Sequence, residues 1–174
     1  LAKDRPQGGG VCVEVGIKAR PPANALSVIH AERAGVSNYS ILASHVLVPP
    51  AIEAVMDDEV AEIQGFLAAG HVCTIMGIGE YYPLVEKYKV PIVVTGFEPV
   101  DIVQGILMTV RQLEKGEARL ENQYARVVSP DGNPEAIKII HEVFTIDDRE
   151  WRGIGNIPMS GYHVRSEYAQ YDAN

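Results

Sequence analysis

The stretch PIVVTGFEPVDIVQGILMTVRQLEKG, residues 91–116, decides the predicted fold. Residues 91–95 are a short, apolar, β-branched run, as found in strands that are buried on both faces. Residues 99–115 follow a helical period, and Gly116 is a residue type that commonly ends helices. The stretch therefore predicts a strand, a short turn and a helix with an apolar stripe. The stripe consists of Val103, Ile106, Leu107, Val110 and Leu113.

The same alternation of strand and helix extends over most of the chain. Short apolar runs predict three more strands, at residues 11–16, 39–44 and 64–68. Helical periods predict three more helices, at residues 23–34, 50–55 and 75–88. Strands and helices that alternate about every 25 to 30 residues indicate βαβ units. We therefore expect an α/β fold with an open, mostly parallel sheet of about four strands and helices on both faces, a three-layer α/β/α arrangement.

The chain changes character after residue 118. A short strand-like piece begins near Leu120, a turn is predicted at Asp131 and Gly132, and a helix is predicted at residues 134–144. The remainder is glycine-spaced, aromatic and without a clear period, so we expect it to be irregular. The predicted organisation is an α/β lobe over residues 1–118. Residues 119–174 would form a C-terminal helix and an irregular segment of a second lobe that is completed elsewhere.

Composition excludes several classes of protein. The formal net charge of −8 and the pI of about 5.1 argue against a nucleic-acid partner, whose binding site would be basic. No apolar run approaches the roughly 18 residues of a membrane span, so we expect no membrane partner and a cytoplasmic protein. Only two cysteines are present, Cys12 and Cys73, and both are expected to be buried apolar side chains. A cysteine-only iron–sulfur site cannot be built from this chain alone.

Polar residues follow each predicted strand. His45 follows the second strand, Gly70 and His71 follow the third, and Glu98 and Asp101 follow the fourth. The carboxyl ends of parallel strands meet at one edge of a sheet, where ligands bind in such folds. We therefore expect these residues at one shared rim, together with Lys18 and Arg20 from the turn after the first strand.

Two explanations fit this rim from the residues alone. In the first, a small-molecule enzyme uses His71 as acid or base with Glu98 as its partner, and Lys18 or Arg20 holds an anionic substrate. In the second, the chain is a non-catalytic structural module. In that case each histidine ties a turn, and Glu98 and Asp101 are acids favoured at the start of a helix by its dipole.

Several motifs resemble those of the HypD family of hydrogenase maturation factors. They are Gly-Phe-Glu-Pro-x-Asp at residues 96–101, Glu-Asn-Gln-Tyr at residues 121–124 and Glu-Trp-Arg-Gly-x-Gly at residues 150–155. Stretches such as LASHVLVPPAIEAVM and GFLAAGHVCTIMG are also similar to the family, and the resemblance runs from about residue 23 to the end. With no initiator methionine at the start, the chain is expected to be a fragment of a longer protein.

The resemblance implies a scaffold on which the Fe(CN)2CO unit of [NiFe]-hydrogenase is assembled. HypD-like proteins have two α/β lobes and a [4Fe-4S] cluster, and they work with a HypC-type chaperone and with HypE, which supplies cyanide. The resemblance makes His71, with Gly70, the best site candidate, facing the cleft that holds iron. Glu98 and Asp101 belong to a second motif and His45 to a third. Motif residues without a separable role are Asn122, Gln123, Tyr124, Trp151 and Arg152.

The sequence also departs from the family pattern. The iron motif Gly-Pro-Gly-Cys-Pro-Val-Cys and the cluster cysteines are absent from residues 1–174. Residues 16–22 read Gly-Ile-Lys-Ala-Arg-Pro-Pro, where the family has Gly-Phe-Glu-Thr-Thr-x-Pro, and the change reverses the local charge. We therefore expect no metal or cofactor in this chain alone, and a metallocentre scaffold rather than a stand-alone enzyme.

Overall fold

The computed structural model describes residues 11–15 and 21–174, and the chain divides into two compact units. The first unit combines residues of Leu1–Leu47 with Lys138–Asn174, and the second is Val48–Ile137. The boundary expected between residues 118 and 119 falls inside the second unit.

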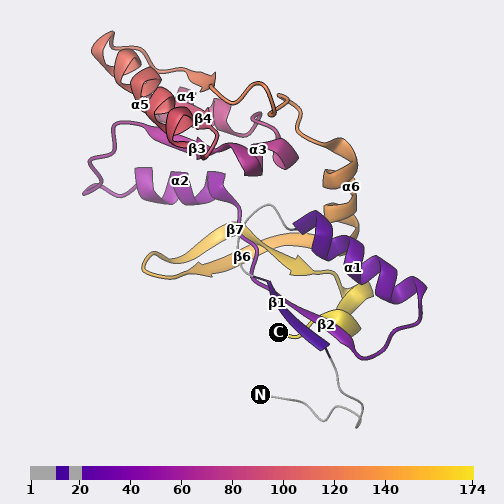
Figure 1. Cartoon of the computed structure of the whole chain (residues 1–174). Helices are drawn as coiled ribbons and strands as arrows, with labels where there is room; N and C mark the ends of the chain where they lie inside the picture. Colours follow the sequence, from indigo (N-terminus) through magenta and orange to yellow (C-terminus); the bar gives the residue numbers. More distant parts are fainter. Residues whose placement is uncertain (1–10, 16–20) are drawn as a thin grey trace. The chain divides into compact units, whose positions relative to one another are not determined.

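The second unit is built on a three-stranded parallel sheet. Its strands are β3 (Phe66–Ala69), β4 (Ile92–Thr95) and β5 (Leu120–Asn122), in the order β3-β4-β5. Ala69 pairs with Thr95, and Val94 pairs with Asn122, so the three strands end level with one another. Their carboxyl ends form a single edge, from which three turns leave the sheet (Figure 1).

Helices cover both faces of this sheet. On one face, Ala68 and Val94 join a buried cluster with residues of α2 (Val48–Met56), α3 (Gly70–Met76) and α4 (Tyr81–Tyr88). On the other face, α5 (Pro99–Glu114) packs on β3 and β4 through Gly105. Strand side chains alternate between faces, so this division follows from the pleat. The predicted α/β class and three-layer arrangement are confirmed. The cluster consists of Ile52, Ala68, Cys73, Ile78, Tyr81, Leu84, Val85, Ile92, Val94 and Val128.

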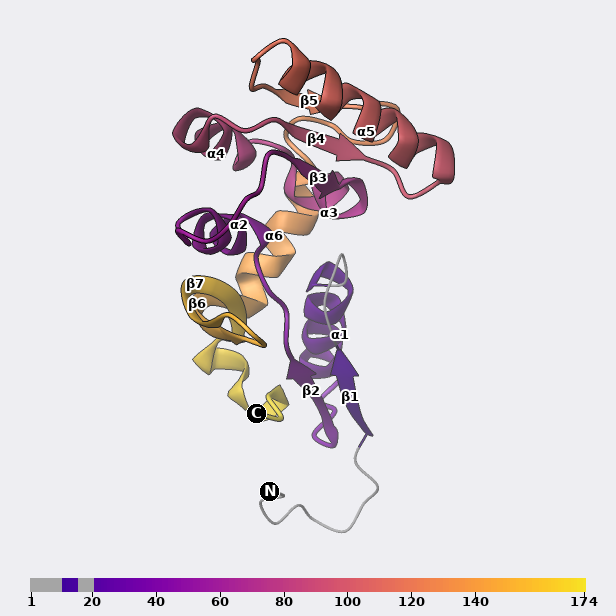
Figure 2. The same ribbon diagram turned by 90° about the vertical axis from the view of Figure 1, so that its left-hand side faces the viewer.

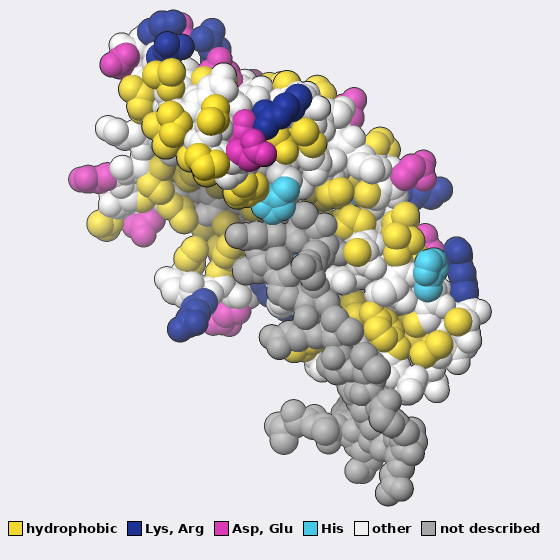
Figure 3. Space-filling model, in the orientation of Figure 1, with side chains coloured by type: hydrophobic (Ala, Val, Ile, Leu, Met, Phe, Trp, Pro, Cys, Tyr) yellow, Lys and Arg dark blue, Asp and Glu magenta, His cyan; other side chains and the backbone are white. Residues whose placement is uncertain are grey.

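Helix α5 turns its polar side toward the sheet. Its buried residues are Asp101, Gly105 and Gln112, whereas the apolar stripe noted in the sequence is exposed. A side chain at Gly105 would collide with Thr95, so glycine allows the helix to lie close to β4. Figure 3 shows hydrophobic side chains gathered over the part of the surface that α5 occupies in Figure 1. The predicted helix exists, but its orientation could not be read from its period.

The helix predicted at residues 75–88 is interrupted. Helix α3 ends at Met76, its C-cap residue Gly77 has φ +77°, and α4 begins at Tyr81. The segment around the predicted turn fills the gap: the N–H of Ile78 donates to Pro130 O at 2.9 Å. Gly132 has φ +66° and its N–H donates to Ser129 O at 3.1 Å, which confirms the predicted turn.

Among its described residues, the first unit contains two further sheets. Strands β1 (Val11–Val15) and β2 (Tyr39–Ala43) are parallel, and α1 (Pro21–Arg33) lies alongside β2 (Figure 2). The four expected strands are therefore divided between two parallel sheets instead of sharing one. Helix α6 (Pro134–Val143) is present where a helix was predicted.

The segment expected to be irregular is a regular hairpin. Strands β6 (Phe144–Trp151) and β7 (Gly155–Val164) pair antiparallel, with a bulge between Asp147 and Arg149, and a 3₁₀ helix follows at Ser166–Tyr171. The glycine spacing that suggested irregular structure instead makes the turn, where Gly153 has φ +85° and Gly155 has φ +101°.

Within the described residues, no helix combines the length and the apolar character needed to cross a membrane.

Candidate functional site

The candidate site lies at the carboxyl edge of β3, β4 and β5. Gly70 and His71 follow β3, Phe97 and Glu98 follow β4, and Gln123 follows β5. Two sequence motifs that are more than twenty residues apart therefore meet at this edge. We call the set His71, Phe97, Glu98, Asp101, Gln123, Tyr124 and Arg126 the strand-end rim.

His71 is the second residue of α3, and its ring is in contact with Phe97. The two ring centroids are 4.6 Å apart with an interplanar angle of 56°. The hydroxyl of Thr74 donates to the backbone oxygen of His71 at 2.7 Å, which ties the first turn of α3. Phe97 is 60% exposed, so an aromatic ring stands at the surface directly beside the imidazole.

Asp101 is a buried carboxylate with two donors. Arg126 Nη2 is 2.7 Å from Asp101 Oδ2, and Gln123 Nε2 is 2.9 Å from Asp101 Oδ1. The hydrogen bond from Arg126, followed by the one from Gln123, lowers the pKa of Asp101 below its ordinary value of 3.8. Asp101 is thus held as an anion. It is therefore better suited to anchoring Arg126 and Gln123 than to donating a proton.

Gln123 links the turn after β5 to the turn after β4. Its Oε1 accepts the N–H of Gly96 at 3.4 Å, while its Nε2 also donates to Gln104 Oε1 at 3.1 Å. The guanidinium of Arg126 lies 4.5 Å from the ring centroid of Tyr124, a cation–π contact. These contacts join the second and third turns of the rim into one network.

Two glycines allow the turns to converge on Tyr124. A Cβ at Gly70 would lie 2.7 Å from Tyr124 Cδ1, and one at Gly96 would lie 2.9 Å from Tyr124 Cε2. A Cβ at Gly96 would also collide with the carboxylate of Asp101. Glycine is therefore required at both positions by close packing, and Tyr124 is the point at which the turns after β3 and β4 meet.

Glu98 is the N-cap residue of α5 and is exposed. Its backbone is extended, with φ −69° and ψ 148°, and its side chain makes no capping hydrogen bond. Its charge contributes to raising the pKa of Arg126, after the larger effect of Asp101. The carboxylate of Glu98 therefore faces solvent but still interacts electrostatically with Arg126 of the rim.

His45 belongs to the other unit. It follows β2, is only 1% exposed, and its Nε2 is 2.8 Å from the Nδ2 of Asn24. Burial, reinforced by the charge of Arg149, lowers its pKa from 6.5 to about 4, so it is neutral at pH 7. The expectation of one shared edge for His45 and His71 is wrong, because β2 and β3 belong to different sheets. Lys18 and Arg20 lie outside the described residues.

The Glu-Trp-Arg-Gly-x-Gly motif lies in the hairpin of β6 and β7, where the side chains form hydrogen bonds within the protein. The Nε1 of Trp151 donates to Ser160 Oγ at 2.8 Å, and Ser160 Oγ donates to Ile157 O at 2.8 Å. Arg149 Nη2 donates to Ala43 O at 2.9 Å, which ties the hairpin to the end of β2. Arg152, for its part, is exposed.

The cysteines do not fit a [4Fe-4S] cluster. Such a cluster takes four thiolates, and the chain has two cysteines. Cys73 is fully buried, as expected, and burial raises the pKa of its thiol to about 11. In the described part of the chain, no group of three or more His, Cys, Asp or Glu side chains is arranged to hold a metal ion.

Phe97 and Arg126 were not among the residues singled out in the sequence. Phe97 stands inside the Gly-Phe-Glu-Pro-x-Asp motif, where an aromatic residue before a helix reads as core. Arg126 comes two residues after Glu-Asn-Gln-Tyr. The sequence did contain a signal for Arg126. A basic residue shortly after one strand can pair with an acidic residue that follows the neighbouring strand.

These features define an α/β protein with a polar site at the carboxyl edge of a parallel sheet. The chain belongs to the HypD family, whose model, described as "Hydrogenase formation hypA family", matches residues 1–174. It is 40% identical over 174 residues to the hydrogenase maturation factor HypD of Rhodobacter capsulatus, covering 99% of this chain and 46% of that protein.

Two other relatives show the same partial coverage. The chain is 37% identical over 179 residues to the hydrogenase expression/formation protein HupD of Azotobacter chroococcum, covering 99% of this chain and 47% of that protein. It is 39% identical over 172 residues to a putative hydrogenase expression/formation protein of Methanocaldococcus jannaschii. That match covers 99% of this chain and 48% of that protein. The chain thus spans about half the length of these relatives.

Proposed function

We propose that this chain is part of a scaffold on which the Fe(CN)2CO unit of [NiFe]-hydrogenase is assembled, acting in the cytoplasm. Membership of the HypD family is the observation that carries the proposal. The match to maturation factors over 99% of the chain supports it further.

The strand-end rim supplies the chain's own contribution to this role. His71 can donate or accept a hydrogen bond beside the apolar ring of Phe97, which suits the orientation of a ligand carried on iron. Asp101, held ionised by Arg126, keeps the turn that presents Phe97 and Glu98 in place. Iron is the cargo in this proposal, and its soft thiolate ligands would come from outside this chain.

The proposed partners are a small chaperone of the HypC type, which would share the iron, and HypE, which would supply cyanide. The family resemblance supports both. Asp101 and Arg126 form an internal ion pair, so the charge that this rim offers a partner is chiefly that of Glu98.

Complementation tests the proposal. The intact gene is introduced into a hydrogenase-producing strain that lacks its own HypD-family protein, and hydrogenase activity is measured together with the infrared bands of iron-bound cyanide and carbon monoxide. We expect both to be restored. Failure of the soluble, folded protein to restore either would contradict the proposed function.

Two histidine variants locate the function at the rim. His71→Ala is expected to lower hydrogenase activity at least tenfold while the thermal unfolding temperature stays close to that of the parent protein. His30→Ala is the matched control, because His30 is exposed on α1. Equal loss of activity in the two variants would contradict a specific role of His71.

A further inference from the structure

The side chain of Arg126 contacts two other residues of the strand-end rim. Its guanidinium lies 4.5 Å from the ring centroid of Tyr124, and its Nη2 is 2.7 Å from Asp101 Oδ2. Tyr124 follows β5, whereas Asp101 lies in the first turn of α5, which follows β4. A guanidinium is a planar cation, so it can stack on a ring and donate to a carboxylate at the same time. One side chain therefore joins two turns of the rim.

The backbone that carries Arg126 is fixed by hydrogen bonds. The N–H groups of Val127 and Val128 both donate to the backbone oxygen of Tyr124 at 2.9 Å. The Nδ2 of Asn122 donates to the backbone oxygen of Val128 at 3.1 Å. These three bonds close the segment after β5 into a compact turn. The side chain of Arg126 is 52% exposed, but it extends toward Asp101 from a defined place.

The ring of Tyr124 lies between the two turns that carry the aromatic pair of the rim. His71 directly follows Gly70, and Phe97 directly follows Gly96. Both glycines pack against the ring of Tyr124 so closely that no Cβ fits at either position. The ring of Tyr124 therefore sets the separation of the two turns. It thereby sets the contact of His71 with Phe97, whose ring centroids are 4.6 Å apart.

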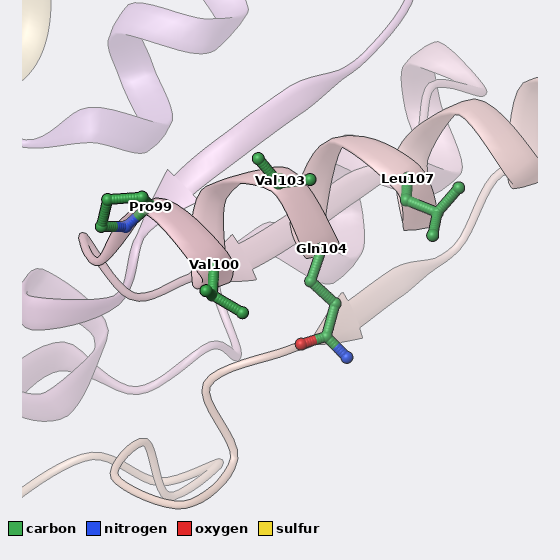
Figure 4. A pocket seen from close by; sticks show the side chains of 5 residues that line it. All are labelled: Pro99, Val100, Val103, Gln104 and Leu107. Atoms are coloured by element: carbon green, nitrogen blue, oxygen red, sulfur yellow. The ribbon is translucent and has the colours of Figure 1, made fainter.

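Asp101 holds the turn after β4 from another side. Its side chain is 7% exposed, and its carboxylate lies against Gly96. Gln123 donates to this carboxylate and also to Gln104, which extends from α5 toward the end of β5 (Figure 4). The hydrogen bond from Arg126 has the larger effect on the pKa of Asp101, and the one from Gln123 comes second. Charge-assisted hydrogen bonds are the stronger kind, so Arg126 is the main anchor of this carboxylate.

We propose that Arg126 is a positioning residue, which holds the ring of Phe97 against the imidazole of His71. It acts through its stacking on Tyr124 and its ion pair with Asp101. Without Arg126 the buried carboxylate loses its counter-ion, and the turn after β4 is free to move away from His71. The inference rests on the proposed function, because His71 is the residue to which that function assigns the orientation of a ligand on iron.

A purely stabilising role for Arg126 predicts a different outcome. In that case the loss of Arg126 would lower the unfolding temperature but leave the surroundings of His71 unchanged. Nuclear magnetic resonance of the imidazole groups separates the two roles, because an aromatic ring shifts the resonances of nuclei beside it. The chain has five histidines, and the resonances that disappear in His71→Ala identify His71. Phe97→Leu gives the reference spectrum for a His71 that has lost its ring contact.

We expect Arg126→Gln to move the resonances of His71 most of the way toward their positions in Phe97→Leu. Arg119→Gln is the matched control, because Arg119 is an exposed arginine of the same unit and pairs with Glu117. It is expected to leave these resonances in place. Unchanged resonances in Arg126→Gln, or equal movement in both arginine variants, would overturn the proposal. Circular dichroism establishes that each variant is folded at the temperature of the measurement.

A double-variant cycle tests whether Arg126 acts through Asp101. Asp101→Asn is expected to move the resonances of His71 in the same direction. The double variant with Arg126→Gln should move them no further than the larger single change, because both substitutions remove one ion pair. It also leaves no unpaired buried charge, so it can be measured even where Arg126→Gln alone does not fold. Additive movements would show that the two residues act separately, and would overturn the proposed route.

Complementation measures the consequence for the proposed function. Arg126→Gln is expected to lower hydrogenase activity roughly tenfold, as the loss of a supporting contact commonly does, whereas Arg119→Gln keeps the activity of the parent. Full activity of Arg126→Gln despite displaced resonances would overturn the role of Arg126 at the site. Failure of the parent protein to complement would instead overturn the proposed function. The resonances of His71 would still decide whether Arg126 positions it.

Discussion

Gly96 occupies a place at the rim in which no side chain fits. Its neighbours are the carboxylate of Asp101 and the ring of Tyr124. We expect Gly96→Ala to lower the free energy of unfolding by about 1–3 kcal/mol, because the added methyl group must displace the ion-paired carboxylate. Denaturant unfolding measures the change.

The control is Gly79→Ala. Gly79 has no atom within 4 Å of its would-be Cβ, so the expected change is within about 0.5 kcal/mol. Equal effects of the two substitutions would mean that crowding at the rim does not matter to stability.

His45 makes stability depend on pH. Its folded-state pKa of about 4 lies below its ordinary value of 6.5. Between these two values the unfolded chain binds a proton that the folded chain does not bind, so stability falls as pH falls from 6.5 to about 4. The loss is at most about 3 kcal/mol. Unfolding by denaturant at a series of pH values measures it.

The variant His45→Gln cannot bind that proton. We expect it to be less stable than the parent at pH 7, because the ring contact with Phe144 is lost, but to show a flatter profile over the acid range. Parallel profiles for parent and variant would assign the acid sensitivity to other groups.

At the scale of the element, α5 is anchored by polar contacts on its inner side. Gln112 is buried, its Oε1 accepts the N–H of Arg119 at 2.7 Å, and its Nε2 donates to Glu121 at 2.5 Å. Gln112→Ala removes both hydrogen bonds and leaves a void. We expect a loss of about 1–3 kcal/mol in the free energy of unfolding.

Gln64→Ala is the comparison, because Gln64 is an exposed glutamine of the same unit. Its expected change is within about 0.5 kcal/mol. If Gln112→Ala were equally mild, the helix would be held by its backbone approach at Gly105 and not by its polar side chains.

At the scale of the whole molecule, the cysteine content limits what the chain can hold. Cys73 is a buried thiol with a pKa of about 11, and Cys12 is the only other cysteine. We expect anaerobic iron titration of this chain to give much less than one bound iron per molecule. Stoichiometric binding, measured after gel filtration, would mean that ligands other than thiolates form a site here.

The organisation of the molecule agrees only partly with the sequence prediction. The α/β class, the helix at residues 99–115 and the turn at Asp131 and Gly132 follow local patterns, and the structure confirms all three. The hairpin of β6 and β7 was missed because its glycines were taken as a sign of irregular structure. The division of the parallel strands between two sheets leaves no local trace, since each strand has the same apolar composition in either arrangement.

The candidate site, like the fold, could be predicted from the sequence only in part. His71, Glu98 and Asp101 could be placed at strand ends from the sequence, because a polar residue after a buried run marks the carboxyl edge. The sequence could not predict that Asp101 pairs with Arg126 or that Phe97 contacts His71. It also could not predict that His45 follows a strand of a different sheet. They depend on which strands become neighbours.

Local sequence patterns were enough to place most of the strands and helices before residue 144, the residues that follow those strands, and the family that the motifs resemble. Periodicity and turn chemistry are local properties, and a short window of sequence contains them. The outward orientation of the apolar stripe of α5 and the ion pair that makes Asp101 an anchor could be seen only in the folded protein. Both depend on contacts between residues far apart in the chain, and the close approach at Gly105 and the pairing with Arg126 arise only when those segments meet.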